Sequence, residues 1–305
     1  MIITRTPLRI SFIGGGTDLK CFYEKHGGAI VNAAIDKYVY VMVRERLLDQ
    51  PRQDTDFERE AKKMVGVDDV EIFTWSDLPA GTGLGSSGSY LVGLLHALHV
   101  FKGDKINRKQ LAEEAYVIET EILDAPVGKQ DQYIAAYGGV KYWEFAKCGL
   151  VSWKNILSEN KSEILSERLM LFFLGVTRKS SSILKEQVAN TDKITEQLIY
   201  VKEQAEHLGS LGHGDDMDLF GRVMNRGWVK KKEFAKKITN PTIDALVEKV
   251  FGVSGSVGVK VVGAGGGGFL LLYVGEWLQR EIREALNLTE VKFNIVNKGT
   301  EVLWT

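Results

Sequence analysis

The alternation of apolar and polar positions in the first 75 residues is typical of β-strands. Residues 9–13, 38–43 and 70–75 are rich in β-branched and aromatic side chains. A glycine turn and a short helix are expected to connect the first of these runs to a second pair of strands. Residues 49–63 are charged and lack periodicity, which predicts a surface loop running into a short helix. This part of the chain is therefore predicted to be α/β.

Two amphipathic helices are predicted next. Residues 90–101 carry apolar side chains at 91, 94, 95 and 98, the spacing of a buried helix face, and this helix is expected to begin near Ser86 or Ser87. A second helix over 108–123 is expected to bury positions 111, 115, 118 and 122. The helical pattern breaks at 124–128, before Lys-Gln-Asp-Gln and a glycine pair at 138 and 139. This break predicts a site loop between elements.

The second half of the chain alternates strands and helices. A strand is predicted at 170–174, followed by one long polar helix over roughly 181–208 and by further helices. Two strand-like segments, Val-Lys-Val-Val at 259–262 and the apolar run 269–273, flank a glycine cluster that ends in four consecutive glycines. We place a domain boundary near 160, which gives domains 1–160 and 161–305. Because no repeat and no low-complexity linker separates them, we expect the two to pack together.

Composition narrows the class of protein. The chain has 305 residues, of which 44% are hydrophobic, so it can bury a substantial core. Its 39 Lys and Arg residues balance 40 Asp and Glu residues, which predicts neither a nucleic acid nor a membrane as partner. The two cysteines, in no metal-like spacing, and the lack of a signal peptide indicate the cytoplasm. The oligomeric state stays open, with a homodimer as one option.

Glycine is concentrated rather than spread. Residues 79–89 place three alternate glycines before a serine pair and open directly into a predicted helix. Glycine allows a close backbone approach, and the N–H groups and dipole at a helix start favour phosphate. A hydroxyl of Ser86 or Ser87 can bind a phosphate oxygen or a magnesium ion. The pattern predicts a triphosphate site, although an ordinary flexible turn with a serine cap would show similar glycines.

This segment matches neither of the common nucleotide loops. It lacks the GKS or GKT of a Walker motif, and a Rossmann fingerprint would need glycine at position 86. Two further clusters occur, at 14–16 before Thr-Asp and at 263–268 between two predicted strands. Each alone can be a tight hairpin. Three such loops in one chain predict a single ligand-filled cleft.

Taken together, these motifs resemble those of the GHMP kinases, the superfamily of galactokinase, homoserine kinase, mevalonate kinase and phosphomevalonate kinase. Its three signature regions match residues 7–18, 79–89 and 260–268, and the resemblance covers essentially the whole chain. Within the superfamily, the sequence is most similar to the D-glycero-D-manno-heptose 7-phosphate kinases. The residues that suggest this are 13–18, 76–87, 128–133 and 175–180.

The resemblance implies an α+β fold, the GHMP kinase fold. Its N-terminal domain is similar to domain 2 of ribosomal protein S5, its C-terminal domain is ferredoxin-like, and the active site lies between them. It also implies an ATP-dependent kinase that phosphorylates O1 of heptose 7-phosphate, a sugar phosphate, on the route to GDP-heptose and surface polysaccharide. A kinase for another sugar, such as fucose or galactose, and a non-catalytic sugar sensor remain as alternatives.

The resemblance also assigns catalytic roles to residues. Asp131 matches the catalytic aspartate that accepts the proton of the sugar hydroxyl, although alone it reads as a solvated loop acid. Arg9 matches the basic residue that faces this aspartate and the phosphoryl group. Ser87 and Glu119 match the magnesium ligands, while Glu119 and Glu121 can equally be solvent-facing helix acids. The residues expected to bind ATP are Pro79, Gly81, Gly83, Leu84, Gly85, Ser86, Ser87, Gly88 and Ser89.

Substrate contacts are expected at three places. Gly15, Gly16, Thr17 and Asp18 match sugar-binding positions, but glycines replace the Gly-Glu-His of galactokinase, which argues against galactose. Arg178 and Ser180 are candidates for the distal phosphate, because an arginine fork and a hydroxyl suit a phosphate group. The third place is Gly265 and Gly266.

Five other side chains have open or structural interpretations. Lys260 can be structural or can approach phosphate. Trp75 and Phe73 can form an adenine pocket or belong to the core. His96 and His99 lie three residues apart among leucines without a third ligand, which favours a structural role.

Overall fold

The computed structural model describes residues 1–47, 53–177, 181–210, 216–255 and 257–305. Its strands are β1 (Ile2–Ile13), β2 (Gly28–Glu45), β3 (Val70–Ser76), β4 (Val140–Phe145), β5 (Val151–Asn155), β6 (Leu169–Phe173), β7 (Gly258–Val261), β8 (Phe269–Tyr273) and β9 (Glu301–Trp304). Its α-helices are α1 (Lys20–His26), α2 (Asp56–Val65), α3 (Ser86–Lys102), α4 (Arg108–Val117), α5 (Gln130–Tyr137), α6 (Glu159–Glu167), α7 (Ser181–Asn190), α8 (Thr195–Gly209), α9 (Asp218–Lys231), α10 (Pro241–Val253) and α11 (Gln279–Leu286).

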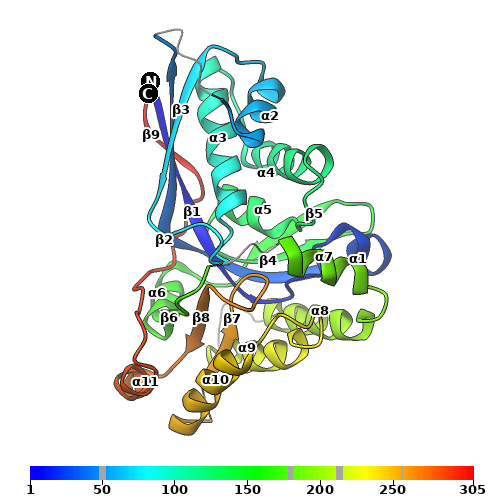
Figure 1. Cartoon of the computed structure of the whole chain (residues 1–305), viewed down its shortest axis with the longest axis vertical. Coiled ribbons are helices and arrows are strands. Elements are labelled where there is room, and N and C mark those ends of the chain that lie inside the picture. Colours follow the sequence, from blue (N-terminus) through cyan, green and yellow to red (C-terminus); the bar gives the residue numbers. More distant parts are fainter. Residues whose placement is uncertain (48–52, 178–180, 211–215, 256) are drawn as a thin grey trace.

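The larger sheet has the order β5-β4-β2-β1-β9, with β3 also paired to β2. In place of the second strand pair expected from the sequence, β2 is one strand of 18 residues. Its first part pairs with β4 and its last part with β3, while β1 runs antiparallel along nearly its whole length. The register between β1 and β2 shifts after Pro7, where a proline cannot donate to the ladder. Helices α2, α3, α4 and α5 lie on one side of this sheet (Figure 1).

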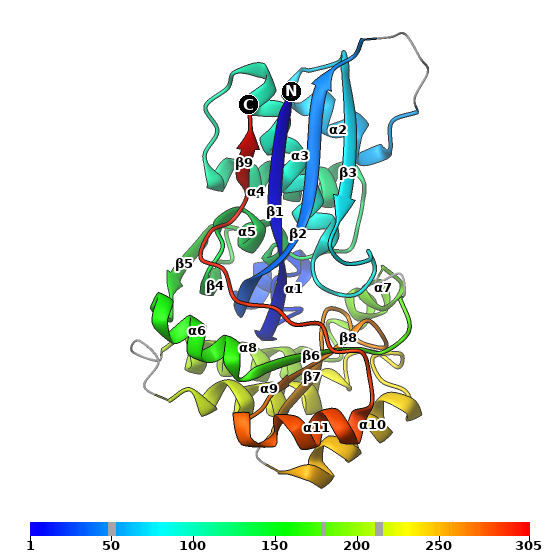
Figure 2. The same ribbon diagram turned by 90° about the vertical axis from the view of Figure 1, so that its left-hand side faces the viewer.

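The smaller sheet is antiparallel, with the order β6-β8-β7. The segment after α11 lies along β6, where the N–H of Phe173 donates to the oxygen of Thr289 at 2.9 Å. The chain then returns to the larger sheet, where β9 pairs with β1 (Figure 2). Both ends of the described chain therefore lie in the larger sheet, and the division at residue 160 stays a prediction.

An apolar core joins the two sheets. Phe12 on β1 packs edge-on against Phe220 on α9, with ring centroids 4.9 Å apart. Both side chains are fully buried in one cluster that also holds the strands of the smaller sheet. The prediction that the two halves pack together is confirmed, and a cavity lies between them.

Local predictions held best where the apolar period was regular. Helix α3 begins at Ser86, as predicted. The prediction of one helix over 181–208 was wrong, because the structure has two helices there, α7 and α8, which are separated at 191–194. The Thr191 hydroxyl donates to the backbone oxygen of Gln187 at 3.1 Å, a bond that competes with the helical ladder.

The helix expected over 108–123 changes its winding near its end. Residues Ile118–Ile122 form a π-turn, in which the N–H of Leu123 donates to the oxygen of Ile118 at 3.0 Å. Ile122 is consequently 46% exposed rather than buried as predicted. Within the described ranges, the structure contains no helix with the length and apolar character needed to cross a bilayer.

Candidate active site

A cavity of about 640 Å³ lies at the junction of the two sheets. All three glycine clusters line it, through Gly14 to Gly16, through Gly81, Gly83 and Gly85, and through Gly263. Ser86 and Ser87, the first residues of α3, line it as well. The prediction that three glycine loops surround one cleft is confirmed.

The start of α3 presents its backbone N–H groups to this cavity. Gly85 adopts a left-handed conformation with φ +75°, and no side chain of the described residues caps the helix. A Cβ at Gly85 would stand 3.0 Å from Arg9 Cγ and 3.2 Å from Asp131 Oδ2. The glycine therefore brings the uncapped helix start against these two side chains, in the arrangement that binds a phosphate group.

The second and third glycine loops pack backbone against backbone. Gly263 has φ +64°, and a Cβ there would lie 2.4 Å from the Cα of Gly83. A Cβ at Gly268 would lie 2.1 Å from the oxygen of Thr82. No other residue fits such contacts without moving a backbone, so these glycines hold the loop before α3 in place.

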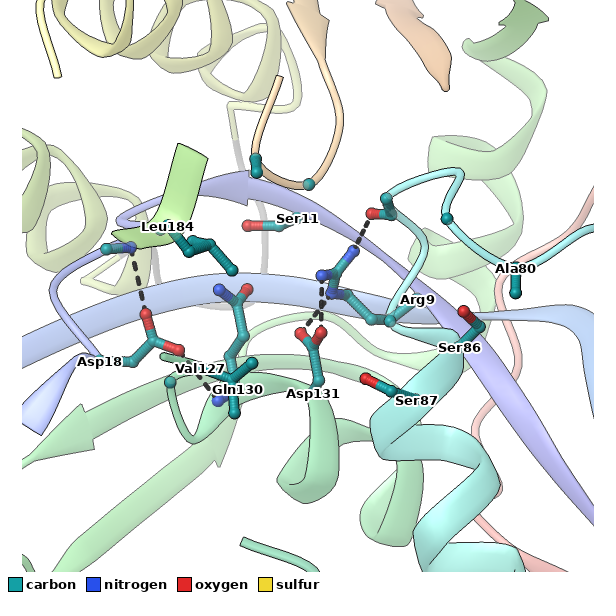
Figure 3. Close-up of a pocket in the computed structure, with 18 of the residues that line it drawn as sticks. Arg9, Ser11, Asp18, Ala80, Ser86, Ser87, Val127, Gln130, Asp131 and Leu184 are labelled. Carbon is teal, nitrogen blue, oxygen red and sulfur yellow. Dashed lines mark hydrogen bonds and ion pairs between the residues drawn. The ribbon is translucent and has the colours of Figure 1, made fainter. Parts of the chain in front are cut away.

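Arg9 and Asp131 form the charged centre of the cavity (Figure 3). Arg9 projects from β1 and Asp131 from the first turn of α5. The guanidinium donates from Nε to Oδ1 at 2.7 Å and from Nη2 to Oδ2 at 2.9 Å. Its Nη1 donates to the oxygen of Gly83 at 2.5 Å. One buried cation therefore connects the carboxylate to the glycine loop, and its fork geometry orients both oxygens.

Glu119 lies behind the serine pair, in the π-turn after α4, and is 2% exposed. Burial raises the pKa of this carboxyl to about 7, although the hydrogen bonds that it accepts from Ser87 and Gln132 act to lower this pKa. The Gln132 bond is 2.6 Å long. Glu121, two residues later, is exposed and reaches Lys20 at 3.9 Å. The π-turn therefore separates the two acids that the sequence could not distinguish.

The Ser87 hydroxyl and the Glu119 carboxylate are oxygen donors of the kind that magnesium prefers, in the small number that it takes beside substrate phosphates. The described residues contain no group of three or more His, Cys, Asp or Glu side chains that could hold a metal by themselves. A buried carboxyl with a raised pKa also gains from a nearby cation, which offsets the cost of its ionisation. The donor set fits a magnesium ion shared with a nucleotide.

Asp18 closes the opposite end of the cavity and is almost completely buried. Its oxygens accept from the N–H groups of Gly16 and Gln130, each at 3.1 Å. Burial raises the pKa of this carboxyl to about 6. A Cβ at Gly128 would lie 1.9 Å from Oδ2, so the loop before α5 presses directly on the carboxylate. Asp18 thereby ties the first glycine turn to the loop that carries Asp131.

Residues 55–139 of the chain match the family described as GHMP kinases N terminal domain. These residues therefore form a GHMP kinase N-terminal domain. A D-glycero-alpha-D-manno-heptose 7-phosphate kinase of Campylobacter jejuni is 29% identical over 90% of this chain and 89% of that protein. An L-fucokinase/L-fucose-1-P guanylyltransferase of Bacteroides fragilis is 25% identical over 98% of this chain, but only 38% of that longer protein.

The crystal structure of a D-glycero-D-manno-heptose 1-phosphate kinase from Bacteroides thetaiotaomicron superposes with a TM-score of 0.81. It is 24% identical and matches 100% of this chain and 99% of that chain. The predicted GHMP kinase fold, which mixes helices and sheets, is confirmed.

The predicted ATP-binding residues divide into two groups. Gly81, Gly83, Gly85, Ser86 and Ser87 line the cavity. The other four do not line the cavity. Leu84 and Ser89 are buried, and the Ser89 hydroxyl donates to the oxygen of Pro7 at 2.8 Å. Pro79 and Gly88 also lie outside the cavity lining.

Only some of the predicted substrate-binding residues line the cavity. Gly15, Gly16 and Asp18 line the cavity, whereas Thr17 is buried beneath them and its hydroxyl donates to the oxygen of Gly14 at 2.8 Å. Gly265 and Gly266 do not line it. Gly265 packs on Ile238, and the N–H of Gly266 donates to the oxygen of Ile238 at 2.6 Å. Arg178 and Ser180 lie outside the described residues.

The structure settles the interpretation of five other side chains. Lys260 lines the cavity and donates to the oxygen of Phe12 at 3.0 Å, and burial lowers the pKa of its ammonium group well below the usual range. Trp75 lines the cavity, is 48% exposed and stacks on Tyr40. Phe73 is also exposed but does not line the cavity, so neither side chain belongs to the core. His96 forms a hydrogen bond with Thr300, and His99 forms hydrogen bonds with Asp104 and Glu114, which agrees with a structural role for both.

Sequence reasoning missed Ser11, Gln130, Gln187 and Lys231, which all line the cavity. Ser11 shares a strand face with Arg9, so the two-residue period of β1 could have indicated it. Gln130 stands beside Asp131 in the same motif. Gln187 on α7 and Lys231 on α9 arrive from the other half of the chain and carry no local signal.

Proposed function

We propose that this chain is a GHMP kinase, which transfers the γ-phosphoryl group of ATP to the anomeric O1 of D-glycero-D-manno-heptose 7-phosphate and forms the 1,7-bisphosphate. The observation that carries the proposal is the contact of Asp131 with Arg9 at 2.7 Å beside the uncapped start of α3. A proton acceptor, a fixed cation and a phosphate-binding helix start meet in one cavity there. The Campylobacter jejuni relative supports heptose 7-phosphate as the acceptor.

The geometry suits an in-line transfer without a covalent enzyme intermediate. The bond from O1 to the γ-phosphorus forms while the bond from that phosphorus to the bridging oxygen breaks, and ADP leaves. The O1 proton passes to the Asp131 carboxylate. Arg9 offers its guanidinium to the negative charge on the transferring group. Because an anomeric hydroxyl is more acidic than an ordinary alcohol, Asp131 mainly has to orient it.

Ser87 and Glu119 would hold the magnesium ion of the nucleotide. When bound, the ion neutralises charge on the β- and γ-phosphate oxygens. The chain's own residues supply the remaining contacts: backbone N–H groups at the start of α3 for the phosphates, and Asp18 with the first glycine turn for the sugar. Arg178 and Ser180 are the proposed contacts of the phosphate already on the sugar.

In this proposal the enzyme acts in the cytoplasm, and its product feeds GDP-heptose synthesis for a surface polysaccharide such as a capsule, S-layer or lipopolysaccharide. The fucokinase of Bacteroides fragilis matches 98% of the chain, so L-fucose is the second candidate acceptor. Asp131 and Arg9 in contact argue against a sensor without activity.

An acceptor screen tests the proposal. Purified protein with ATP and Mg²⁺ is given heptose 7-phosphate, L-fucose, galactose and unphosphorylated heptose, and ADP release is followed by a coupled assay. We expect the highest kcat/KM with heptose 7-phosphate and a new phosphorus NMR signal from a phosphate on O1. A higher kcat/KM with any unphosphorylated sugar would show that the proposed acceptor is wrong.

A further inference from the structure

Three residues that line the cavity each carry a polar atom that is buried without a hydrogen-bond partner among the described residues. The atoms are Ser11 Oγ, Gln130 Oε1 and Gln187 Nε2. Ser11 is 5% exposed and Gln187 is 4% exposed, so surrounding solvent does not replace the missing partners. Buried polar groups in folded proteins almost always have a partner, and each exception calls for an explanation.

These three side chains come from β1, α5 and α7, yet they surround the same two residues of the first glycine turn. A Cβ at Gly15 would lie 3.8 Å from Gln130 Nε2 and 4.0 Å from Ser11 Oγ. A Cβ at Gly16 would lie 2.2 Å from Gln187 Nε2. Gln187 therefore occupies space that a side chain at position 16 would need, and the two glycines leave the cavity open at this point.

The cluster also lies next to the charged centre. Gln130 directly precedes Asp131 in the chain, and in Figure 3 its amide group stands between Asp18 and Asp131, on the side of Ser11. A sugar hydroxyl held by Asp131 would place the neighbouring carbons of the ring within reach of this cluster. The unpartnered atoms are thus beside the position of the acceptor and away from Ser86 and Ser87.

The chemistry of the three atoms matches adjacent hydroxyl groups. The Ser11 hydroxyl both donates and accepts, Gln130 Oε1 accepts, and Gln187 Nε2 donates. Each hydroxyl of a sugar also donates and accepts, so two neighbouring hydroxyls can satisfy all three atoms. A phosphate group would accept only and would leave Gln130 Oε1 without a donor.

We propose that Ser11, Gln130 and Gln187 bind the hydroxyl on C2, next to the one that is phosphorylated, together with its neighbour on C3, and so select an acceptor with vicinal hydroxyls. The inference rests on the proposed function, since it assigns specificity within the same cavity. A site that hydrogen-bonds a substrate hydroxyl strongly rejects an analogue without it, because its own buried polar groups then stay unpaired.

The test is a cycle of protein variants and deoxy substrates. Ser11→Ala and Gln187→Leu are assayed with heptose 7-phosphate and with its 2-deoxy analogue, which lacks the hydroxyl next to O1. We expect each variant to lower kcat/KM for the parent sugar by about 10- to 100-fold. With the 2-deoxy sugar, at least one variant should have the same kcat/KM as the unaltered protein. The KM for ATP of both variants should stay within about twofold of that of the unaltered protein.

Gln197→Leu is the matched control. Gln197 lies on α8, its Oε1 is also buried and unpartnered among the described residues, and it does not line the cavity. This variant should keep the kinetics of the unaltered protein, and thermal unfolding of all three variants shows whether they fold. Loss of activity in Ser11→Ala and Gln187→Leu that is equal with both sugars would overturn the inference, as would no loss at all.

The inference and the proposed function can fail separately. If the acceptor screen finds another sugar, the same cycle is run with that sugar and its deoxy analogue, and coupling there supports the inference while the heptose assignment fails. If heptose 7-phosphate is the acceptor but no coupling appears, only the inference fails. A protein that phosphorylates no sugar overturns both.

Discussion

The two ends of the cavity are built from different parts of the chain. The end proposed for the phosphates, which we call the phosphate end, is formed by residues 81–87 and consists mainly of glycines and of the uncapped start of α3. The acceptor end, formed by Ser11, Asp18, Gln130 and Gln187, consists of side chains from four separate elements or turns. Every nucleoside triphosphate has the same phosphates, so backbone groups suffice there. Sugars differ in their hydroxyls, so telling them apart requires side chains.

Asp131 stands between the two ends, and its replacement should have the largest effect. In Asp131→Asn we expect kcat to fall by at least about 1,000-fold, because the proton acceptor is lost. The dissociation constant for ATP, measured by calorimetry, should change by no more than about threefold, since the phosphate end is untouched. Asp192→Asn, at an exposed ion pair with Lys25, is the control and should remain fully active. Equal turnover in Asp131→Asn would remove this residue from the reaction.

Gly263→Ala tests whether the phosphate end depends on backbone contact. A Cβ at 263 meets the Cα of Gly83 at 2.4 Å, so the free energy of unfolding should fall by roughly 3 kcal/mol or more, with at least about tenfold weaker ATP binding. Gly103 has φ +88° and open space around it. Gly103→Ala should therefore cost only the backbone strain, about 1 kcal/mol. Similar losses in urea unfolding of both variants would contradict a rigid contact between the loops.

Asp18 gives the acceptor end its own pH dependence. Its pKa is raised from 3.8 to about 6 by burial, so between these values the folded protein keeps a proton that the unfolded chain has lost. The contribution of Asp18 to the free energy of unfolding should therefore fall by roughly 3 kcal/mol as the pH rises through this window.

Urea unfolding of the ligand-free protein between pH 4 and pH 7 measures this change. The difference in stability between the unaltered protein and Asp18→Asn should shrink or reverse with rising pH, and should be constant above about pH 7. Asp192→Asn is again the matched variant, at an exposed position. If this difference in stability does not vary with pH, burial does not raise the pKa of Asp18.

Trp75 should show the smallest effect of the four. It lines the cavity on β3 at the phosphate end, stacked on Tyr40 with ring centroids 5.0 Å apart. Its flat face is suited to an adenine ring, so Trp75→Leu should raise KM for ATP by about 3- to 10-fold and leave KM for the sugar unchanged. Trp277→Leu, at a tryptophan that is 78% exposed and outside the cavity lining, is the control. A larger change in KM for the sugar would place Trp75 at the acceptor end instead.

The local features of the phosphate end could be predicted from the sequence alone. The start of α3 at Ser86 and the positive φ angles of Gly81, Gly83 and Gly85 follow from short motifs, whereas Asp131, which was expected in a loop, lies in the first turn of α5. Such features depend on the conformational freedom of glycine and on free N–H groups at a helix start, and both are properties of a few consecutive residues.

Only the tertiary structure decided the rest. It turned Glu119 inward and Glu121 outward through one π-turn, and it used the glycines at 263 and 265 for packing against Gly83 and Ile238. It also brought Gln187 to Gly16, although 171 positions separate them in the numbering. Contacts between distant elements depend on the packing of the whole core, and no local period of apolar residues records which side chains will meet there.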